Sequence, residues 1–379
     1  MALILTDEQN MVRDSARAFL ADRAGVAQLR RLRDTSDPDG FSRELWKAFA
    51  ELGFCGILVP ESLGGAGLGH VEAGIVAEEI GRNLTPSPFL GTAVLGVTTL
   101  MAAGDAARNA ALLPKLAAGD LLMALAVEER AKHAPAATAL AATRSGNGFV
   151  LDGAKSFVVD GHVADLLVVA ARTAGAPGDT EGLTLFLVDA RAPGVEIERT
   201  VMVDAHNAAR IVFRRVAVDA DAVLGDVDRG WALLEGVLDA GRAAVAAEMT
   251  GVGEEAFGRT LSYLRQRRQF GRPIGSFQAL QHRAAQVFTE LEITRAAVLK
   301  ALQVLDADPG AAGPIVSVAK ARAGASTTLA VQEAVQMHGG IGMTDAFDIG
   351  LFMKRARVGQ ELFGDAGFHA DRLARLHNY

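Results

Sequence analysis

The sequence predicts an α+β multidomain protein with an N-terminal all-α domain, a middle β-barrel or sandwich domain and a C-terminal four-helix bundle. Two observations predict this order. Alanine-rich stretches that favour helices occupy both ends of the chain, and short β-type runs separated by turns occupy its middle. A chain of 379 residues also exceeds the usual size of one domain. We therefore expect domains at residues 1–120, 121–224 and 225–379.

The N-terminal domain is predicted to be helical from Thr6 onward. Thr6 and Gln9 have the spacing of a capping box, and an amphipathic run follows them. Further helices are expected at residues 42–52 and 70–81. The glycine-rich residues 59–69 between them form a loop in this interpretation.

The middle domain is predicted from short runs of β-forming residues. The expected strands cover residues 121–127, 148–151, 155–159, 166–171, 183–188, 195–199 and 209–218. Turns are expected at Asp152-Gly153, at Asp160-Gly161 and at Pro193-Gly194. Many short strands at close spacing are typical of a barrel or a sandwich.

The C-terminal domain is predicted to contain four long helical runs, at residues 231–270, 277–307, 311–338 and 352–379. Helices of this length are typical of an antiparallel bundle with its side chains packed along one central axis.

The composition excludes several classes of protein. A net charge of −7 argues against nucleic-acid binding. A single cysteine, Cys55, excludes an internal disulfide and a multi-cysteine metal site, and it favours a reducing, cytoplasmic location. The N-terminus lacks the features of a signal peptide. No run of about 18 apolar residues occurs, so we expect no membrane insertion.

Two segments of the C-terminal domain indicate a phosphate-containing ligand. Residues 267–278 place arginines and an aromatic ring beside a Gly/Pro turn, and residues 336–342 form a second glycine-rich turn. Guanidinium groups and backbone N–H groups at such turns bind phosphates. Each segment alone has a structural alternative, namely a helix C-terminus or a simple chain reversal. His338 has no partner at metal-ligand spacing, so we expect a structural role and no metal site.

These motifs, in this order, resemble the acyl-CoA dehydrogenase family. The resemblance covers the whole chain and is carried by residues 59–69, 152–157, 267–278 and 336–342. It implies FAD as the cofactor, an acyl-CoA thioester of fatty acid or steroid catabolism as the substrate and α,β-dehydrogenation as the reaction. It also implies a tetramer and an electron-transfer flavoprotein or similar acceptor.

The resemblance also implies which residues meet FAD. Arg267 matches the arginine that contacts the pyrophosphate, and Phe270 matches the ring that lies against the adenosine. Phe277 and Gln278 match a cofactor-contacting pair at the start of the next helix. The turn that cradles the ADP moiety of a partner subunit's FAD is matched by Gln336, Gly339 and Gly340.

The chain departs from the family at the catalytic base. The family removes the α-proton with a glutamate, and the matching position holds Phe363, which cannot accept a proton. Some members place the glutamate directly before an arginine of the first bundle helix, and there the chain has Gly241 before Arg242. Asp365 and Glu361 are the nearest alternative carboxylates, and Asp365, which follows Gly364, is the candidate that could point inward. Arg242 itself is a candidate substrate-binding residue.

The flavin-ring contacts of the middle domain are also altered. The family's Trp-Ile-Thr segment, whose hydroxyl bonds the flavin, is Phe157-Val158-Val159 here, so Phe157 keeps the aromatic ring and Val159 loses the hydroxyl. The family usually has a Thr-Glu-Pro turn followed by Gly-Ser-Asp, and this chain has Val-Glu-Glu-Arg-Ala-Lys-His at the matching residues 127–133.

These losses resemble the small, base-poor subunits of α2β2 acyl-CoA dehydrogenases, such as those of the pimeloyl-CoA dehydrogenase type. In that arrangement a glutamate-bearing homologue supplies the base. Three alternatives stay open: a self-sufficient homotetramer with a displaced base, a flavin mono-oxygenase on the same fold, and a catalytically inert structural subunit.

Overall fold

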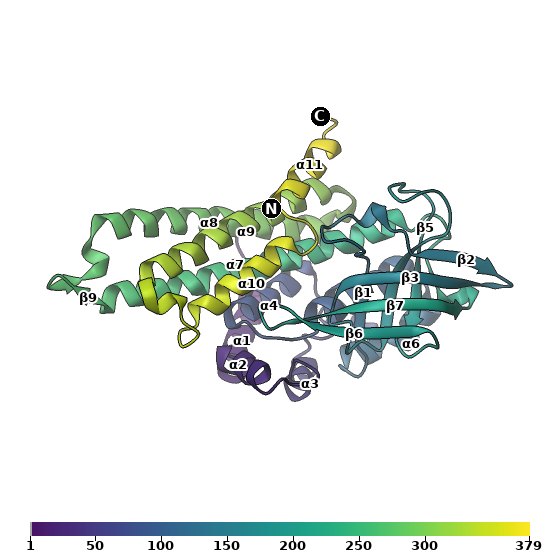
Figure 1. Ribbon diagram of the computed structural model, residues 1–379, viewed down its shortest axis with the longest axis horizontal. Coiled ribbons are helices and arrows are strands. Elements are labelled where there is room, and N and C mark those ends of the chain that lie inside the picture. Colours follow the sequence, from purple (N-terminus) through teal and green to yellow (C-terminus); the bar gives the residue numbers. More distant parts are fainter. Residues whose placement is uncertain (1) are drawn as a thin grey trace. The chain divides into compact units, whose positions relative to one another are not determined.

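A computed structural model describes residues 2–379 (Figure 1). Its contacts divide these residues into two compact units. The helical unit joins residues 2–34, 70–86 and 242–379, and the sheet unit joins residues 35–69 and 87–241. The predicted boundaries near residues 120 and 224 divide the sequence into consecutive segments. The two units are defined by packing and each joins several segments, so those boundaries stay a prediction.

The N-terminal part of the helical unit contains α1 (Asp7–Arg23), α2 (Val26–Asp34) and α4 (His70–Asn83). The predicted capping box is confirmed, because the Thr6 hydroxyl accepts the Gln9 N–H at 3.2 Å and the Gln9 side chain accepts the Thr6 N–H at 3.0 Å. Arg17 of α1 donates to the buried carboxylate of Glu79 at 2.6 Å. This ion pair holds α1 on α4.

The bundle contains α7 (Trp231–Gln266), α8 (Gln278–Ala307), α9 (Gly313–His338) and α10 (Ile349–Glu361), followed by α11 (Ala366–Leu376). Helix α9 packs against α8, α10 and α11. Glycines bring α7 close to its neighbours: a Cβ on Gly253 would lie 2.9 Å from Leu291, and a Cβ on Gly359 would lie 2.9 Å from Met249. The predicted bundle is therefore confirmed.

The predicted last run of the bundle, residues 352–379, is wrong in one respect. It is two helices, α10 and α11, separated by a turn in which Phe363 has φ +55° and Gly364 has φ +109°. A non-glycine residue in the left-handed region ends a helix, so the chain cannot continue straight. This break lies at the expected position of the base.

The sheet unit contains four further helical segments beside its strands. They are α3 (Arg43–Glu51), the π-helix Phe89–Gly96, α5 (Val97–Ala103) and α6 (Ala106–Ala117). The predicted helix at 42–52 is confirmed as α3, because the Ser42 side chain accepts the Leu45 N–H and caps it. The π-helix is tied to the first strand by Thr92, whose hydroxyl bonds the backbone of Met123.

Eight strands form one sheet in this unit (Figure 1). They are β1 (Met123–Ala126), β2 (Ala141–Ser145), β3 (Gly148–Val159), β4 (Leu166–Arg172), β5 (Leu183–Asp189), β6 (Val195–Val201), β7 (Asn207–Val218) and β8 (Val223–Leu224). The order is β6-β7-β3-β2-β4-β5-β8, with β1 paired to β4. Strands from both halves of the sheet share one hydrophobic core. Strands β3 and β7 contribute Phe149, Ile211 and Phe213, and strands β4 and β5 contribute Leu167 and Phe186. This packing fits the predicted β-domain.

Three details of the strand prediction are wrong. Residues 148–159 are a single strand, and the expected turn at Asp152-Gly153 is a bulge with Gly153 at φ +144°. Strand β2 was not expected, because only Ala142 among its five residues is buried and no alternation shows in its sequence. The two residues of β8 are too few to leave a periodic signal.

A buried ion pair fixes the irregular segment between β1 and β2 to the sheet. Lys155, fully buried on β3, donates to the Glu129 carboxylate at 2.6 Å and to the Val127 carbonyl at 3.0 Å. The Glu129 carboxylate also accepts the N–H groups of Ala139 and Leu140. Glu129 therefore ties the segment between β1 and β2 to the middle of β3.

Candidate functional site: the end of the helical bundle and the turn after α10

A short hairpin follows α7 and projects from the end of the bundle (Figure 1). Its strands are β9 (Arg268–Gln269) and β10 (Arg272–Pro273), joined by the two residues Phe270 and Gly271. Both joining residues have positive φ, +51° and +77°, as a two-residue hairpin turn requires. Phe270 is 90% exposed, although a large aromatic side chain ordinarily packs inside. The hairpin therefore presents a bare ring next to Arg267.

The start of α8 lies directly behind this ring. Phe277 is the N-cap residue, and no side chain caps the first turn of the helix. The Phe270 and Phe277 rings meet edge to face at 6.1 Å, and the Arg272 guanidinium lies 4.1 Å from the Phe277 ring centre. An uncapped helix N-terminus, which begins at Gln278, offers free N–H groups to an anion.

The end of α9 forms the second predicted segment. Gly339 ends the helix at φ +67° and ψ −143°, and its N–H bonds the Gln336 carbonyl. Gln336, Gly339 and Gly340 are all exposed, and a Cβ added to either glycine would meet no atom within 4 Å. A ligand can therefore approach the backbone of this turn closely.

His338 brings the two segments to the same end of the bundle. Its ring stacks on Tyr263 of α7 at 4.4 Å and lies 4.9 Å from Phe347. Its Nδ1 donates to the Ala334 carbonyl at 2.7 Å, and burial lowers the pKa of the imidazole. These contacts give His338 the structural role that its sequence context predicts. They also place the end of α9 beside the last turns of α7.

The two segments fit a dinucleotide that carries a pyrophosphate. An exposed arginine, an uncapped helix N-terminus and an open glycine turn supply positive charge and N–H groups, and Phe270 supplies an aromatic surface for an adenine ring. Arg267, Phe270, Phe277 and Gln278 all come from the α7–α8 connection. Gln336, Gly339 and Gly340 come from the end of α9. The residues present therefore suit the ADP half of FAD.

The two glycines of the α9 turn should respond differently to alanine. Gly339→Ala should lower the free energy of unfolding by about 1–2 kcal/mol, because its backbone conformation is strained for any residue with a Cβ. Gly340→Ala is the matched control, and it should stay within about 0.5 kcal/mol of the parent. Urea unfolding monitored by circular dichroism measures both free energies. Equal stabilities of the two variants would contradict the strained backbone conformation assigned to Gly339.

The turn after α10 contains Phe363, which the sequence analysis matches to the family's base. Phe363 is buried, and its carbonyl accepts the Arg242 Nε–H at 3.3 Å. Arg242 itself is fully buried on α7 and lies 5.5 Å from the Phe368 ring centre. Arg242 thus joins the two places that the sequence analysis matches to the family's base positions, Phe363 in the turn and Gly241 before Arg242. Neither offers a carboxylate.

Lys320 of α9 contacts this turn, and the sequence analysis did not identify it. Its Nζ donates to the carbonyls of Gln360 at 3.2 Å and Gly364 at 3.0 Å. Burial, with a smaller contribution from the Arg242 charge, lowers the pKa of the Lys320 amine to about 7. Two buried basic side chains, Arg242 and Lys320, therefore hold the backbone of the turn. The only available signal was a lysine within an otherwise small-residue stretch of a long helix.

Lys320 should make stability depend on pH. The pKa of its amine is about 7 in the folded chain and about 10.4 when unfolded, so the unfolded state binds the extra proton between these values. The unfolding free energy should therefore rise as pH increases from about 7 toward about 10, by up to a few kcal/mol. Lys320→Met should flatten this rise.

Lys47→Met on the exposed face of α3 is the control for this measurement, and it should keep the slope of the parent. Unfolding in urea at a series of pH values gives the slopes. A Lys320→Met variant with an unchanged slope would show that Lys320 titrates normally.

Asp365, the nearest alternative carboxylate, is engaged as a helix cap. It precedes α11, and its Oδ1 accepts the Phe368 N–H at 2.9 Å. Glu361 is paired with Arg357 at 2.8 Å. The two acids closest to Phe363 along the chain thus both have structural partners.

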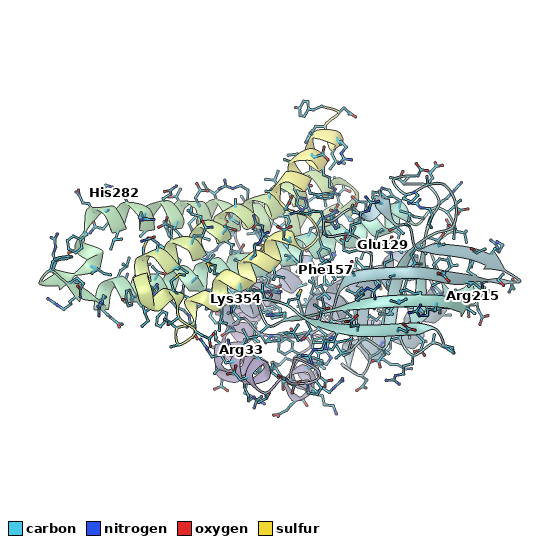
Figure 2. All side chains as sticks on the ribbon, in the orientation of Figure 1. Arg33, Glu129, Phe157, Arg215, His282 and Lys354 are labelled. Carbon is cyan, nitrogen blue, oxygen red and sulfur yellow. The ribbon has the colours of Figure 1, made fainter. Side chains whose placement is uncertain are left out.

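In the sheet unit, Phe157 stands out by its backbone. It has φ +51° at a register shift of β3, and its side chain is 50% exposed (labelled in Figure 2). Val159 pairs with Ala208 on β7 and carries no hydroxyl. Close by, His133 contacts Glu128, and the Glu128 carbonyl accepts the Ser156 N–H. Residues 127–133 are thus occupied with internal contacts.

Over residues 2–379 the structure contains no cluster of His, Cys, Asp and Glu that could hold a metal ion. In the same residues, no helix is long and apolar enough to cross a membrane.

Family models match almost the entire chain. The acyl-CoA dehydrogenase N-terminal domain matches residues 6–120, the middle domain residues 124–216 and the C-terminal domain residues 228–376. The chain belongs to the acyl-CoA dehydrogenase family. The resemblance seen in the motifs is therefore confirmed, as is the fold of helices, sheet and helices.

Curated relatives and solved structures agree with this assignment. The acyl-CoA dehydrogenase IpdE2 of Mycobacterium tuberculosis is 32% identical over 94% of this chain and 93% of its own. A variant of the Tcur3481–Tcur3483 steroid ACAD is 32% identical, with a TM-score of 0.88 over 98% of both chains. A chain of the ChsE4–ChsE5 complex from Mycobacterium tuberculosis is 25% identical, with a TM-score of 0.90 over 100% of this chain and 99% of that chain.

Membership establishes the general chemistry. Acyl-CoA dehydrogenases are oxidoreductases that act on CH–CH groups, and the family's members are flavoproteins that dehydrogenate acyl-CoA thioesters with FAD.

Proposed function

We propose that this chain is one subunit of a FAD-dependent acyl-CoA dehydrogenase whose catalytic glutamate comes from a homologous partner in a heterotetramer. The observation that carries the proposal is the turn after α10, where Phe363 replaces the base and Arg242 follows Gly241. The reaction removes a proton from the α-carbon of the thioester, so a chain without a base there needs a second source.

The chemistry divides between the chain and the cofactor. When bound, FAD accepts the hydride that leaves the β-carbon. This chain contributes Arg267 and the uncapped start of α8 to the pyrophosphate, and the open turn at Gly339 and Gly340 to the ADP moiety. Phe270 provides the exposed surface for the adenine ring. None of these residues moves a proton.

The asymmetry between retained and altered contacts supports a heteromer. The end of the bundle, which in this family serves the FAD of a neighbouring subunit, keeps its residues. The sheet unit would serve the chain's own flavin ring. There Val159 replaces the family's hydroxyl-bearing residue, and Glu128 and Glu129 make internal contacts. Such a division suits a subunit that completes its partner's cofactor site.

Two of the similar structures also favour a pair of different chains, because one is the Tcur3481–Tcur3483 steroid ACAD and the other is the ChsE4–ChsE5 complex. One of them is a steroid ACAD, so a steroid-derived acyl-CoA is the substrate class we favour over a simple fatty acyl-CoA. Electron-transfer flavoprotein is the electron acceptor in this proposal. A cytoplasmic location stays part of it, resting on the single, buried thiol of Cys55.

The proposal predicts that the chain purifies almost without flavin when it is produced alone. Co-production with a glutamate-bearing homologue encoded beside it should give a stable complex that is yellow and that dehydrogenates acyl-CoA. Visible absorbance, size-exclusion chromatography and acceptor-linked turnover measure the three properties. Full activity of this chain alone would refute the proposal.

Within that complex, Arg267→Gln should weaken FAD retention by about 10- to 100-fold, because a charge-assisted bond to a phosphate contributes roughly 1.5–3 kcal/mol. Arg268→Gln, the next residue and equally exposed, is the matched control and should retain FAD as the parent does. Fluorescence of released flavin during dialysis gives both dissociation constants. Equal retention by the two variants would remove Arg267 from the cofactor site.

A further inference from the structure

A cavity of about 330 Å³ lies inside the helical unit, between α1, α4, α7 and α8. Its inner wall is apolar and includes the buried side chains of Ile75, Ala247, Val298 and Leu302. Small-molecule sites span about 300–1,000 Å³, so the cavity lies at the small end of that range. The face of α7 that lines it does not carry Arg242, which bonds the turn at Phe363 instead.

Glycines fix the walls of this cavity. A Cβ on Gly74 of α4 would lie 2.4 Å from Leu302 of α8, and a Cβ on Gly251 of α7 would lie 1.9 Å from the carbonyl oxygen of Glu78. The backbone of α4 at Gly74 is therefore packed against the Leu302 side chain, and the backbone of α7 at Gly251 against that of α4 at Glu78. Because they cannot approach further, the cavity cannot be closed by sliding the helices together.

Helix α1 forms the entrance. Arg13 and Arg17 line the cavity, and their side chains keep 34% and 47% of their surface exposed. Two bonds hold α1 in place, from Arg17 to Glu79 at 2.6 Å and from Gln9 to Glu72 at 2.9 Å. The charged end of the cavity thus meets solvent, and the apolar end is buried.

Guanidinium groups outnumber carboxylates at the charged end. The charged lining residues are Arg13, Arg17, Arg82, Arg295, Glu78 and Glu254. Glu254 is shared, since Arg82 donates to it at 2.6 Å and Arg295 also contacts it. Adding Glu79, the partner of Arg17, gives four arginines against three carboxylates at the cavity, while the exposed acids Asp14 and Glu292 outside its lining contact Arg13 and Arg295. Buried Glu79 Oε2 and Arg82 Nε also lack hydrogen-bond partners, although they lie 3.3 Å apart.

We propose that this cavity binds a medium-chain fatty carboxylate, with the alkyl chain along the apolar wall and the carboxylate among the arginines of α1, α4 and α8. An arginine cluster at the mouth recognises a carboxylate by charge-assisted hydrogen bonds. The buried apolar wall binds an unbranched alkyl chain by removing it from water. This site is independent of the dehydrogenase function proposed above.

Glu78 gives the site a pH dependence. Burial, reinforced by the neighbouring Glu254, raises the pKa of its carboxyl to about 7, against the opposing effect of Arg82 and Arg295. Glu79 adds to the increase, and Arg13 and Arg17 face the same space from α1. Below neutral pH the Glu78 carboxyl is neutral and no longer repels the ligand's carboxylate.

Octanoate is the probe, titrated by calorimetry into the chain and, where it forms, into its complex. Octanoate should bind with one site per chain in this cavity, and octanol should bind at least tenfold more weakly because it lacks the charge. Octanoyl-CoA in excess should leave the site available, since its thioester end carries no carboxylate. Displacement of octanoate by octanoyl-CoA would place the binding in an acyl-CoA site and overturn the proposal.

Two variants locate the ligand. Ala247→Phe fills the apolar wall and should abolish octanoate binding. Arg13 pairs with the exposed Asp14, so Arg13→Gln should weaken binding about tenfold without affecting folding. Arg191→Gln, 86% exposed in the sheet unit, is the matched control and should bind as the parent does. Octanoate binding that is absent from the parent, or unaffected by Arg13→Gln, would refute the site.

The pH dependence is a second test. Octanoate should bind several-fold more tightly at about pH 6 than at about pH 8, and Glu78→Gln should remove this difference while it preserves binding. A pH-independent affinity in the parent would contradict the role of Glu78.

Discussion

The turn between α10 and α11 depends on two buried basic side chains. Arg242 from α7 and Lys320 from α9 donate to the carbonyls of Gln360, Phe363 and Gly364. Buried carbonyls without donors are costly, so these bonds allow the chain to leave α10 through a residue with positive φ. The same contacts join three bundle helices at one point. They hold the backbone at Phe363, which the sequence analysis matches to the family's base and which has no acidic group.

This arrangement separates the architecture of the catalytic site from its chemistry. Three hydrogen bonds from buried side chains hold the backbone around Phe363, and the end of the bundle has elements that suit a pyrophosphate. In the proposed function, the chain lacks the proton acceptor and part of the flavin-ring contacts. A subunit that completes its partner's cofactor site, and receives a base in return, accounts for both observations with one arrangement.

Much of the fold could be predicted from the sequence, because its signals are local. The Thr6–Gln9 capping box, the glycine at the end of α9 and the long alanine-rich runs each determine their own structure. The errors arose where distant residues decide. Residues 148–159 stay one strand because β7 pairs along the whole length, across the bulge at Gly153. The break at Phe363 depends on contacts from α7 and α9.

The candidate site divides in the same way. The residues of the bundle end were predicted by motif, and the structure brings them together through the stacking of His338 on Tyr263. Lys320, the Lys155–Glu129 pair and the cavity beside Glu78 left no local pattern, since each is created by helices or strands far apart in sequence.

The central claim is that this chain cannot abstract the α-proton by itself. Incubation of acyl-CoA in D2O with the chain alone, with the glutamate-bearing homologue alone and with their complex, followed by mass spectrometry of the thioester, tests it directly. The account predicts deuterium at the α-carbon only when the homologue is present. Exchange catalysed by this chain alone, at a rate comparable with that of the complex, would contradict it.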